Sequence, residues 1–215
     1  MQTSVSKLEE LFKRFPEIAS LKEALVSVLE EWLALYERDG ILFLAGNGGS
    51  AADCDHICGE LMKGFKSKRP LPEEVRKNFA DLFGEAGADT GKKLQMGLRA
   101  VSLLSHPGLL SAFSNDVDPE LIFAQQLWAL ARPGDLFFGI STGGGAKNLL
   151  RAFMAARVKG VKSILLTGNR GGICTKFADI VIPVPESETY RIQEYHLPIY
   201  HALCLAVEEN IFKEK

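Results

Sequence analysis

The chain has 215 residues, of which 47% are hydrophobic and 24% charged, and its formal net charge is −2. This length favours one α/β domain over two and is enough to bury one sizeable core. A charge balance this close to neutral argues against a nucleic-acid partner. The apolar runs are too short to cross a bilayer, and no signal-peptide core follows the polar N-terminus. We therefore expect a cytoplasmic protein with no membrane partner.

Helical spacing of apolar residues predicts an N-terminal helical arm over residues 1–39, broken near Pro16. Residues 41–45 then form a continuous apolar run, which is typical of a strand buried on both faces. After a glycine-rich turn at 46–50, we expect a helix that reaches about residue 65.

Residues 66–97 differ in composition from the segments on either side. They begin as a basic, proline-bearing connector and continue as a short amphipathic helix over 73–83. We expect the glycine-rich stretch 84–91 to be mobile. We interpret residues 66–97 as an insertion or lid within a single domain that spans residues 1–215.

Short apolar strands alternate with helices over the rest of the chain. We expect strands at 100–104, 136–140, 163–167 and 180–184, and helices at about 119–131, 146–158 and 190–212. This alternation predicts an α/β fold with a doubly wound, mainly parallel sheet flanked by helices in three layers. Pro183 indicates the end of its strand or an edge of the sheet.

The four cysteines form no CxxC pair and, in a signal-free chain of this size, they indicate reduced thiols. Cys54 and Cys58 lie four residues apart on a predicted helix, a spacing at which a metal could bind. Free cysteine is commonly buried, so we favour two small core side chains.

Two strand–loop–helix junctions share one design. Gly46-Asn47-Gly48-Gly49-Ser50 follows the first strand, and Ser141-Thr142-Gly143-Gly144-Gly145 follows the strand at 136–140. Glycine lets backbone N–H groups approach an anion, hydroxyls add donors, and the helix N-terminus behind each loop contributes positive partial charge. Doubly wound sheets bind ligands at the carboxyl ends of their strands. Neither loop matches the P-loop pattern GxxxxGK[ST] or the dinucleotide-binding pattern GxGxxG. The prediction of an anion or sugar site therefore depends on finding two such loops at strand ends.

Two helices carry candidate catalytic or metal-binding side chains. His56 and Glu60 lie four residues apart, on one helix face, where they could bind a metal, form an acid/base couple or simply make a surface pair. Gln193 and His201 lie eight residues apart, about two turns on one face of the C-terminal helix. We interpret His196 of the same helix as a surface or interface histidine.

Together these pieces resemble the sugar isomerase (SIS) domain. They resemble in particular the phosphoheptose isomerases, which interconvert sedoheptulose 7-phosphate and D-glycero-D-manno-heptose 7-phosphate. The resemblance covers residues 40–65 and 100–212. It rests on these motifs: Gly46 to Ser50 with His56 and Glu60; Asn115-Asp116; Ser141-Thr142; Thr167-Gly168 with Gly171-Gly172; and Arg191-Ile192-Gln193-Glu194 with His201.

The resemblance implies a role for each matching residue. Substrate contacts are expected from Asn47, Gly48, Gly49, Ser50, Asn115, Asp116, Ser141, Thr142, Gly143 and Gln193. His56, Glu60, Gln193 and His201 match the family's zinc ligands, and such a donor set suits Zn²⁺. Glu60 and His201 also match its catalytic acid/base pair. The family forms homotetramers with active sites at subunit contacts.

The implied reaction gives a reason for these residue types. Aldose–ketose isomerisation moves a proton between neighbouring carbons through an enediolate. A carboxylate can take and return that proton, a second group handles the oxygens, and a cation or donor stabilises the developing negative charge. We assign to Glu60 the transfer of the proton between the two carbons. We assign to His201 the proton transfer at the sugar oxygens or in ring opening.

The chain departs from the family pattern at two places. The family's usual second loop reads Ser-Thr-Ser-Gly-Asn-Ser, whereas Gly143 and Ala146 stand here in place of two phosphate-binding serines. This removes two hydroxyl donors, each worth roughly 1.5–3 kcal/mol toward a charged group. The family's Thr-Gly-Arg element after the glutamate reads Met62-Lys63-Gly64, without the arginine. An isomerase of a different phosphosugar therefore stays open.

Two non-enzymatic functions are alternatives. One is a SIS scaffold of the type that binds the bacterial replication initiator, and the other is a phosphosugar-sensing regulator. Such scaffolds typically lack the final histidine, which is kept here as His201. We expect no DNA-binding domain, because the charge does not suggest one. The complete set of His56, Glu60, Gln193 and His201 favours an enzyme.

Overall fold

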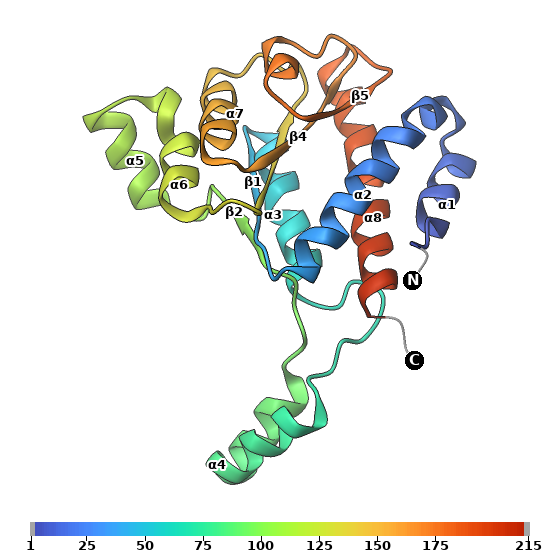
Figure 1. Cartoon of the computed structure of the whole chain (residues 1–215), viewed down its shortest axis with the longest axis vertical. Coiled ribbons are helices and arrows are strands. Elements are labelled where there is room, and N and C mark those ends of the chain that lie inside the picture. The colour runs from blue at the N-terminus through green and yellow to red at the C-terminus, as the bar shows by residue number, and fades with distance from the viewer. Residues whose placement is uncertain (1–2, 213–215) are drawn as a thin grey trace.

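The computed structural model describes residues 3–212, and within them five strands form one parallel sheet (Figure 1). The strands are β1 (Leu42–Gly46), β2 (Ala100–Ser102), β3 (Leu136–Ser141), β4 (Lys162–Gly168) and β5 (Ile180–Val184). Their order is β2-β1-β3-β4-β5, and every neighbouring pair is parallel. The predicted doubly wound α/β fold is confirmed, and Pro183 lies in the edge strand β5.

Helices cover both faces of this sheet. They are α1 (Ser6–Arg14), α2 (Lys22–Glu37), α3 (Gly49–Met62), α4 (Glu73–Lys93), α5 (Pro107–Asp116), α6 (Ile122–Leu130), α7 (Lys147–Lys159) and α8 (Thr189–Ile211), with short 3-10 turns η1 (Pro16–Leu21), η2 (Pro119–Leu121) and η3 (Ile173–Lys176). The apolar core shows that α2, α3 and α8 pack on one face, and α6 and α7 on the other. Helix α1 packs on α8. Within residues 3–212, no helix is long and apolar enough to cross a membrane.

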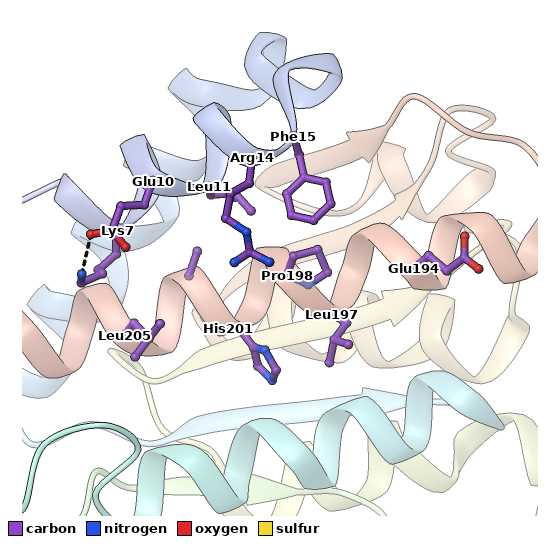
Figure 2. Close-up of a pocket in the computed structure, with 11 residues that line it drawn as sticks. Lys7, Glu10, Leu11, Arg14, Phe15, Glu194, Leu197, Pro198, His201 and Leu205 are labelled. Atoms are coloured by element: carbon purple, nitrogen blue, oxygen red, sulfur yellow. Dashed lines mark hydrogen bonds and ion pairs between the residues drawn. The ribbon is translucent and has the colours of Figure 1, made fainter.

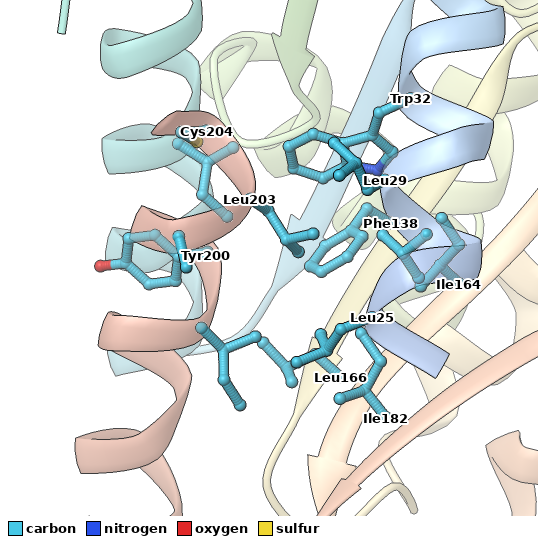
Figure 3. Close-up of a cluster of buried hydrophobic side chains, with 14 of the residues drawn as sticks. Leu25, Leu29, Trp32, Phe138, Ile164, Leu166, Ile182, Tyr200, Leu203 and Cys204 are labelled. Atoms are coloured by element: carbon cyan, nitrogen blue, oxygen red, sulfur yellow. The ribbon is translucent and has the colours of Figure 1, made fainter. Parts of the chain in front are cut away.

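The strands are continuous apolar runs because both of their faces are buried. Phe137 of β3 faces the core under α6 and α7, whereas its neighbour Phe138 faces α2 and α8. On that second face, the ring of Trp32 from α2 meets Phe138 edge-on, with 5.5 Å between ring centroids (Figure 3). Full burial of one such side chain stabilises the fold by about 1.5–3 kcal/mol.

The N-terminal arm breaks where predicted. Helix α1 ends at Arg14, and Pro16 begins η1. The helix after the first glycine-rich loop is shorter than expected, ending at Met62 rather than near residue 65, because Lys63 is extended (φ −137°, ψ 173°). Helix α5 was not predicted, because its apolar pattern is short and the proline at its start is also common in loops.

Helix α4 is a hairpin of two helical halves. Gly84 (φ 61°, ψ −138°) makes the turn, a backbone conformation that favours glycine. The halves lie close because Gly87 and Gly91 have no side chain. A Cβ atom at Gly87 would collide with the carbonyl oxygen of Phe79. The residues after Gly84 are therefore helical, and Gly87 and Gly91 serve close helix packing. The expected mobility of 84–91 stays a prediction.

The α4 hairpin extends away from the rest of the domain (Figure 1). Its two connecting segments meet at an antiparallel bridge between Pro70 and Gln95. The hairpin leaves from the end of α3, on the side of the sheet where the strands begin, whereas the glycine-rich loops lie where the strands end. Within its own chain it therefore covers neither loop.

Candidate active site

The two glycine-rich loops lie side by side at the point where the strand order reverses. Strands β1 and β3 are neighbours, but β1 leads into α3 on one face and β3 leads into α7 on the other. In doubly wound sheets this switch point opens a crevice for ligands. The side chains of Asn47, in the first loop, and Asn148, in the first turn of α7, exchange two amide hydrogen bonds of 3.0 and 2.9 Å.

The first loop depends on two glycines for different reasons. Gly48 has φ 57° and ψ −121°, which an L side chain rarely adopts, although no atom lies within 4 Å of a Cβ built there. At Gly49 a Cβ atom would displace the side-chain amide of Gln193, which lies against this glycine. Gln193 of α8 therefore lies directly over the start of α3. Ser50 is buried, and its N–H donates to the carbonyl of Asn47 at 3.1 Å.

The second loop is held by close backbone contacts. A Cβ atom at Gly144 would collide with the carbonyl of Gly171, so the two turns touch through their backbones. The N–H of Gly144 donates to the Ser141 hydroxyl oxygen at 3.1 Å, and the carbonyl of Thr142 accepts the N–H of Gly168 at 3.0 Å. At Gly143, by contrast, nothing lies within 4 Å of a Cβ atom. The loop is thus fixed in shape with open space at residue 143.

Three candidate catalytic side chains meet between α3 and α8. His56 Nε2 lies 3.2 Å from Glu60 Oε1 and 3.5 Å from His201 Nε2. The other Glu60 oxygen lies 3.0 Å from Lys63 Nζ. On α8, His201 points toward α3 (Figure 2), and the ring of Phe65 packs against it at 5.3 Å between centroids.

A cavity of about 240 Å³ lies between α1 and α8, beside His201 (Figure 2). Arg14 of α1 reaches into it, and Phe15 and Leu197 contribute apolar walls. Burial lowers the pKa of His201, and the neighbouring His56 lowers it further, against an opposing effect of Glu60. The imidazole of His201 is therefore neutral at neutral pH, with a lone pair available.

The side chains of His56, Glu60 and His201 are of the types that bind zinc, and two distances between their donor atoms suit a zinc ion. With metal–ligand bonds of about 2.0–2.1 Å, neighbouring ligand atoms of a tetrahedral site lie roughly 3.3–3.4 Å apart. The contacts of His56 with Glu60 and with His201, at 3.2 and 3.5 Å, match this edge length. Over residues 3–212, however, no group of three or more His, Cys, Asp or Glu side chains is arranged so that it could hold a metal ion. The three side chains of one chain therefore do not form a metal site by themselves.

Gln193 lies apart from those three side chains within one chain. It covers Gly49, and Gly49 precedes His56 by seven residues, which is about 10 Å along α3. This position suits a substrate contact at the first loop. The expected role of Gln193 as a metal ligand stays a prediction.

Asn115 and Asp116 end α5 and are exposed. The Asn115 amide donates to the Asp116 carboxylate at 2.8 Å. Among the described residues, their side chains make no hydrogen bond to the other expected site residues, so their role as sugar contacts also stays a prediction.

The interpretation of His196 as a surface residue is wrong. His196 is fully buried, and neither ring nitrogen has a hydrogen-bond partner. Burial lowers its pKa to about 4. A signal was present in the sequence, because Ile192, His196, Ile199 and Leu203 recur at the 4-3-4 spacing of a core-facing helix stripe. The four cysteines are free, as predicted, and the predicted burial of Cys54 and Cys58 is confirmed; Cys174 and Cys204 are buried as well.

Asp53 and Tyr200 belong to the surroundings of His56 but were not among the predicted site residues. The Tyr200 hydroxyl lies 3.1 Å from Asp53 Oδ1 and 3.0 Å from His56 Nδ1. Burial, followed by the charge of Asp53, raises the pKa of Tyr200, so the phenol keeps its proton at neutral pH. The i, i+3 spacing of Asp53 and His56 was readable in the sequence. The contact with Tyr200 was not, because it depends on how α8 packs on α3.

Comparisons with known proteins identify the family. The family model of the SIS domain matches residues 106–206. The chain is 32% identical to a phosphoheptose isomerase of Sulfurimonas denitrificans, over 99% of this chain and 95% of that protein. It is 37% identical to one from Burkholderia pseudomallei, over 86% of this chain and 81% of that protein.

A solved structure agrees with the sequence comparisons. The phosphoheptose isomerase of Neisseria gonorrhoeae is 29% identical and superimposes with a TM-score of 0.73, covering 95% of this chain and 96% of that one. The fold and these similarities lead to one conclusion: the chain belongs to the phosphoheptose isomerase family of SIS-domain enzymes.

Proposed function

We propose that this chain is a metal-assisted aldose–ketose isomerase that converts sedoheptulose 7-phosphate to D-glycero-D-manno-heptose 7-phosphate. One observation carries the proposal. This chain belongs to the phosphoheptose isomerase family, and its His56, Glu60 and His201 meet between α3 and α8. Helix α3 begins at the first of the two glycine-rich loops.

The phosphate would lie at the second loop and the start of α7. Because the Ser141 oxygen accepts the N–H of Gly144, its own hydroxyl proton is free to be donated to a phosphate oxygen. The positive end of α7 favours an anion there. With Gly143 and Ala146 in place of serines, backbone N–H groups carry more of the binding than hydroxyls do.

The sugar carbons would lie near Glu60 and His201. Glu60 would remove the proton from one carbon and return it to its neighbour, held in place by the contact with Lys63. Neutral His201 can accept a hydroxyl proton and give it back during ring opening and isomerisation. A zinc ion bound to His56, Glu60 and His201 would supply positive charge that stabilises the enediolate oxygens. One lone pair of His201 cannot bind the ion and accept a proton at once, so His201 would act as the base only while Nε2 is off the ion.

A homotetramer with sites at subunit contacts would complete the ligand set. Within one chain Gln193 lies over Gly49 rather than beside His201, eight residues further along α8. A Gln193 from a second copy is thus the natural fourth donor. The cavity between α1 and α8 lies beside His201, where such a contact could form.

A non-catalytic scaffold is the less favoured alternative. A scaffold has no use for a carboxylate and two imidazoles whose nitrogen and oxygen atoms converge within 3.5 Å of His56 Nε2. The family relationship points to the same conclusion, because the matched relatives are named as isomerases.

Conversion of sedoheptulose 7-phosphate, followed by NMR with Glu60→Gln beside the wild type, tests the proposal. Loss of the base should lower kcat by roughly 10²–10⁴-fold while the fold is kept. Glu30→Gln, an exposed change on α2, is the matched control and should turn over normally. Full turnover by Glu60→Gln, or none by the wild type with zinc present, would overturn the proposal.

A further inference from the structure

The hydroxyl of Tyr200 reaches out of the hydrophobic core to the back of His56. The Tyr200 ring is buried among apolar side chains of α8, α2 and the sheet, with its hydroxyl directed away from them (Figure 3). That hydroxyl lies 3.1 Å from Asp53 Oδ1 and 3.0 Å from His56 Nδ1. Asp53 and His56 are one turn apart on α3, so both face α8.

The directions of these two hydrogen bonds follow from a count of protons. A phenol has one proton to donate, and a carboxylate can only accept. Tyr200 therefore donates to Asp53, and the contact with His56 requires Nδ1–H of the imidazole to donate to the Tyr200 oxygen. Nδ1 then carries a proton, and in the neutral imidazole Nε2 carries the lone pair.

That lone pair points at the other candidate ligands. Nε2 is the atom of His56 that lies 3.2 Å from Glu60 and 3.5 Å from His201. A hydrogen bond at the remote nitrogen of a metal-binding histidine fixes its tautomer and ring orientation and raises its basicity. A lone pair on Nε2 that faces a carboxylate and a second imidazole is placed to share a cation with them.

We propose that Asp53 and Tyr200 are positioning residues that hold His56 with its proton on Nδ1 and so prepare Nε2 as a metal ligand. This inference rests on the proposed function for the identity of the ion. The tautomer of His56, however, is a property of the metal-free protein.

The first test measures the tautomer without metal. Long-range ¹H–¹⁵N NMR of the metal-free wild type should show His56 with a protonated Nδ1 and an unprotonated Nε2. In Tyr200→Phe, which keeps the buried ring, we expect the proton to move to Nε2. A wild-type His56 protonated on Nε2 would overturn the proposal, whether or not the protein is an isomerase.

The second test measures zinc affinity by competition with a chromophoric chelator. Loss of such a supporting hydrogen bond typically costs 10- to 100-fold in metal affinity, and we expect that loss in Tyr200→Phe. Tyr195→Phe on the same helix is the matched control, because its hydroxyl bonds only to exposed Glu17. Its affinity should stay within twofold of the wild type. Equal zinc affinity in Tyr200→Phe and Tyr195→Phe would contradict the inference.

The two tests separate this inference from the proposed function. If His56 shows the expected tautomer and Tyr200→Phe loses it, the positioning role stands even for a protein that converts no sugar phosphate. Thermal unfolding of both tyrosine variants checks that the fold is kept, and Asp53→Asn should shift the His56 tautomer in the same direction as Tyr200→Phe.

Discussion

Residue 143 is a position where one substitution can change how the second loop binds a phosphate. Gly143 takes an ordinary backbone conformation, and a Cβ atom there would meet nothing within 4 Å. A serine therefore fits without strain and adds a hydroxyl donor at the second loop. Since a hydrogen bond to a charged group contributes roughly 1.5–3 kcal/mol, Gly143→Ser should lower KM for the phosphosugar about tenfold or more.

The matched control is Gly108→Ser, another glycine whose Cβ position is open but which lies in α5, away from the loop. Steady-state kinetics of both variants would decide the matter. An unchanged KM in Gly143→Ser would show that backbone N–H groups alone bind the phosphate.

His196 makes stability depend on pH. The pKa of His196 is lowered to about 4 in the folded chain against an ordinary value of 6.5. As the pH falls below 6.5, His196 becomes protonated in the unfolded chain. In the folded chain it stays neutral until the pH approaches 4. The free energy of unfolding therefore falls over this window, by about 2 kcal/mol at pH 5 from this residue alone.

His196→Leu should remove this acid-dependent fall in the free energy of unfolding. Leucine has no group to protonate and leaves no unpaired nitrogen in the core. Urea denaturation at pH 7.5 and pH 5 would measure the difference, with exposed His106→Leu as the control. If the wild type and His196→Leu lose equal stability between these pH values, the account of His196 fails.

Between elements, the buried carboxylate of Glu208 joins the end of α3 to α8. It accepts the backbone N–H groups of Phe65, Lys66 and Ser67 at 2.9–3.1 Å, and Arg69 Nε at 2.8 Å. Arg69 also donates to the carbonyl of Leu61 at 2.8 Å. Although burial tends to raise the pKa of Glu208, these donors lower it overall. Glu208 thus helps to hold the segment that places Phe65 on His201.

Glu208→Ala should cost about 3–5 kcal/mol of stability, because it leaves Arg69 buried without its partner. The neighbouring Glu209→Ala is the matched control, since Glu209 bonds only to the hydroxyls of Ser4 and Ser6 in a half-buried position. Chemical denaturation of the two variants compares them directly. Similar small losses in both would contradict this role of the Arg69–Glu208 pair.

Elements with a strong local pattern could be predicted from the sequence, and those that depend on packing could not. The strand at 41–45 and the break at Pro16 follow from apolar runs and from the chemistry of proline. The helical second half of α4 was missed because Gly87 and Gly91 indicate flexibility unless the opposing half of the hairpin is known.

At the scale of the whole molecule, the sheet order brings the site together. The resemblance to a known family selects His56, Glu60 and His201, and the packing of α8 on α3 brings them into contact. The pairing of Asn47 with Asn148 and the contacts of Tyr200 join residues more than 100 positions apart. No local pattern encodes such contacts. The same packing separates Gln193 from His201, which is why the proposal includes a second copy of the chain.

The conversion of sedoheptulose 7-phosphate before and after metal removal tests the central claim most directly. The protein as purified should form the aldose phosphate, lose at least 100-fold in turnover after treatment with a chelator, and regain it when Zn²⁺ is added back. Unchanged turnover after complete metal removal would contradict the metal-assisted mechanism. Absence of turnover on every C5–C7 ketose phosphate, with zinc restored, would contradict the isomerase itself.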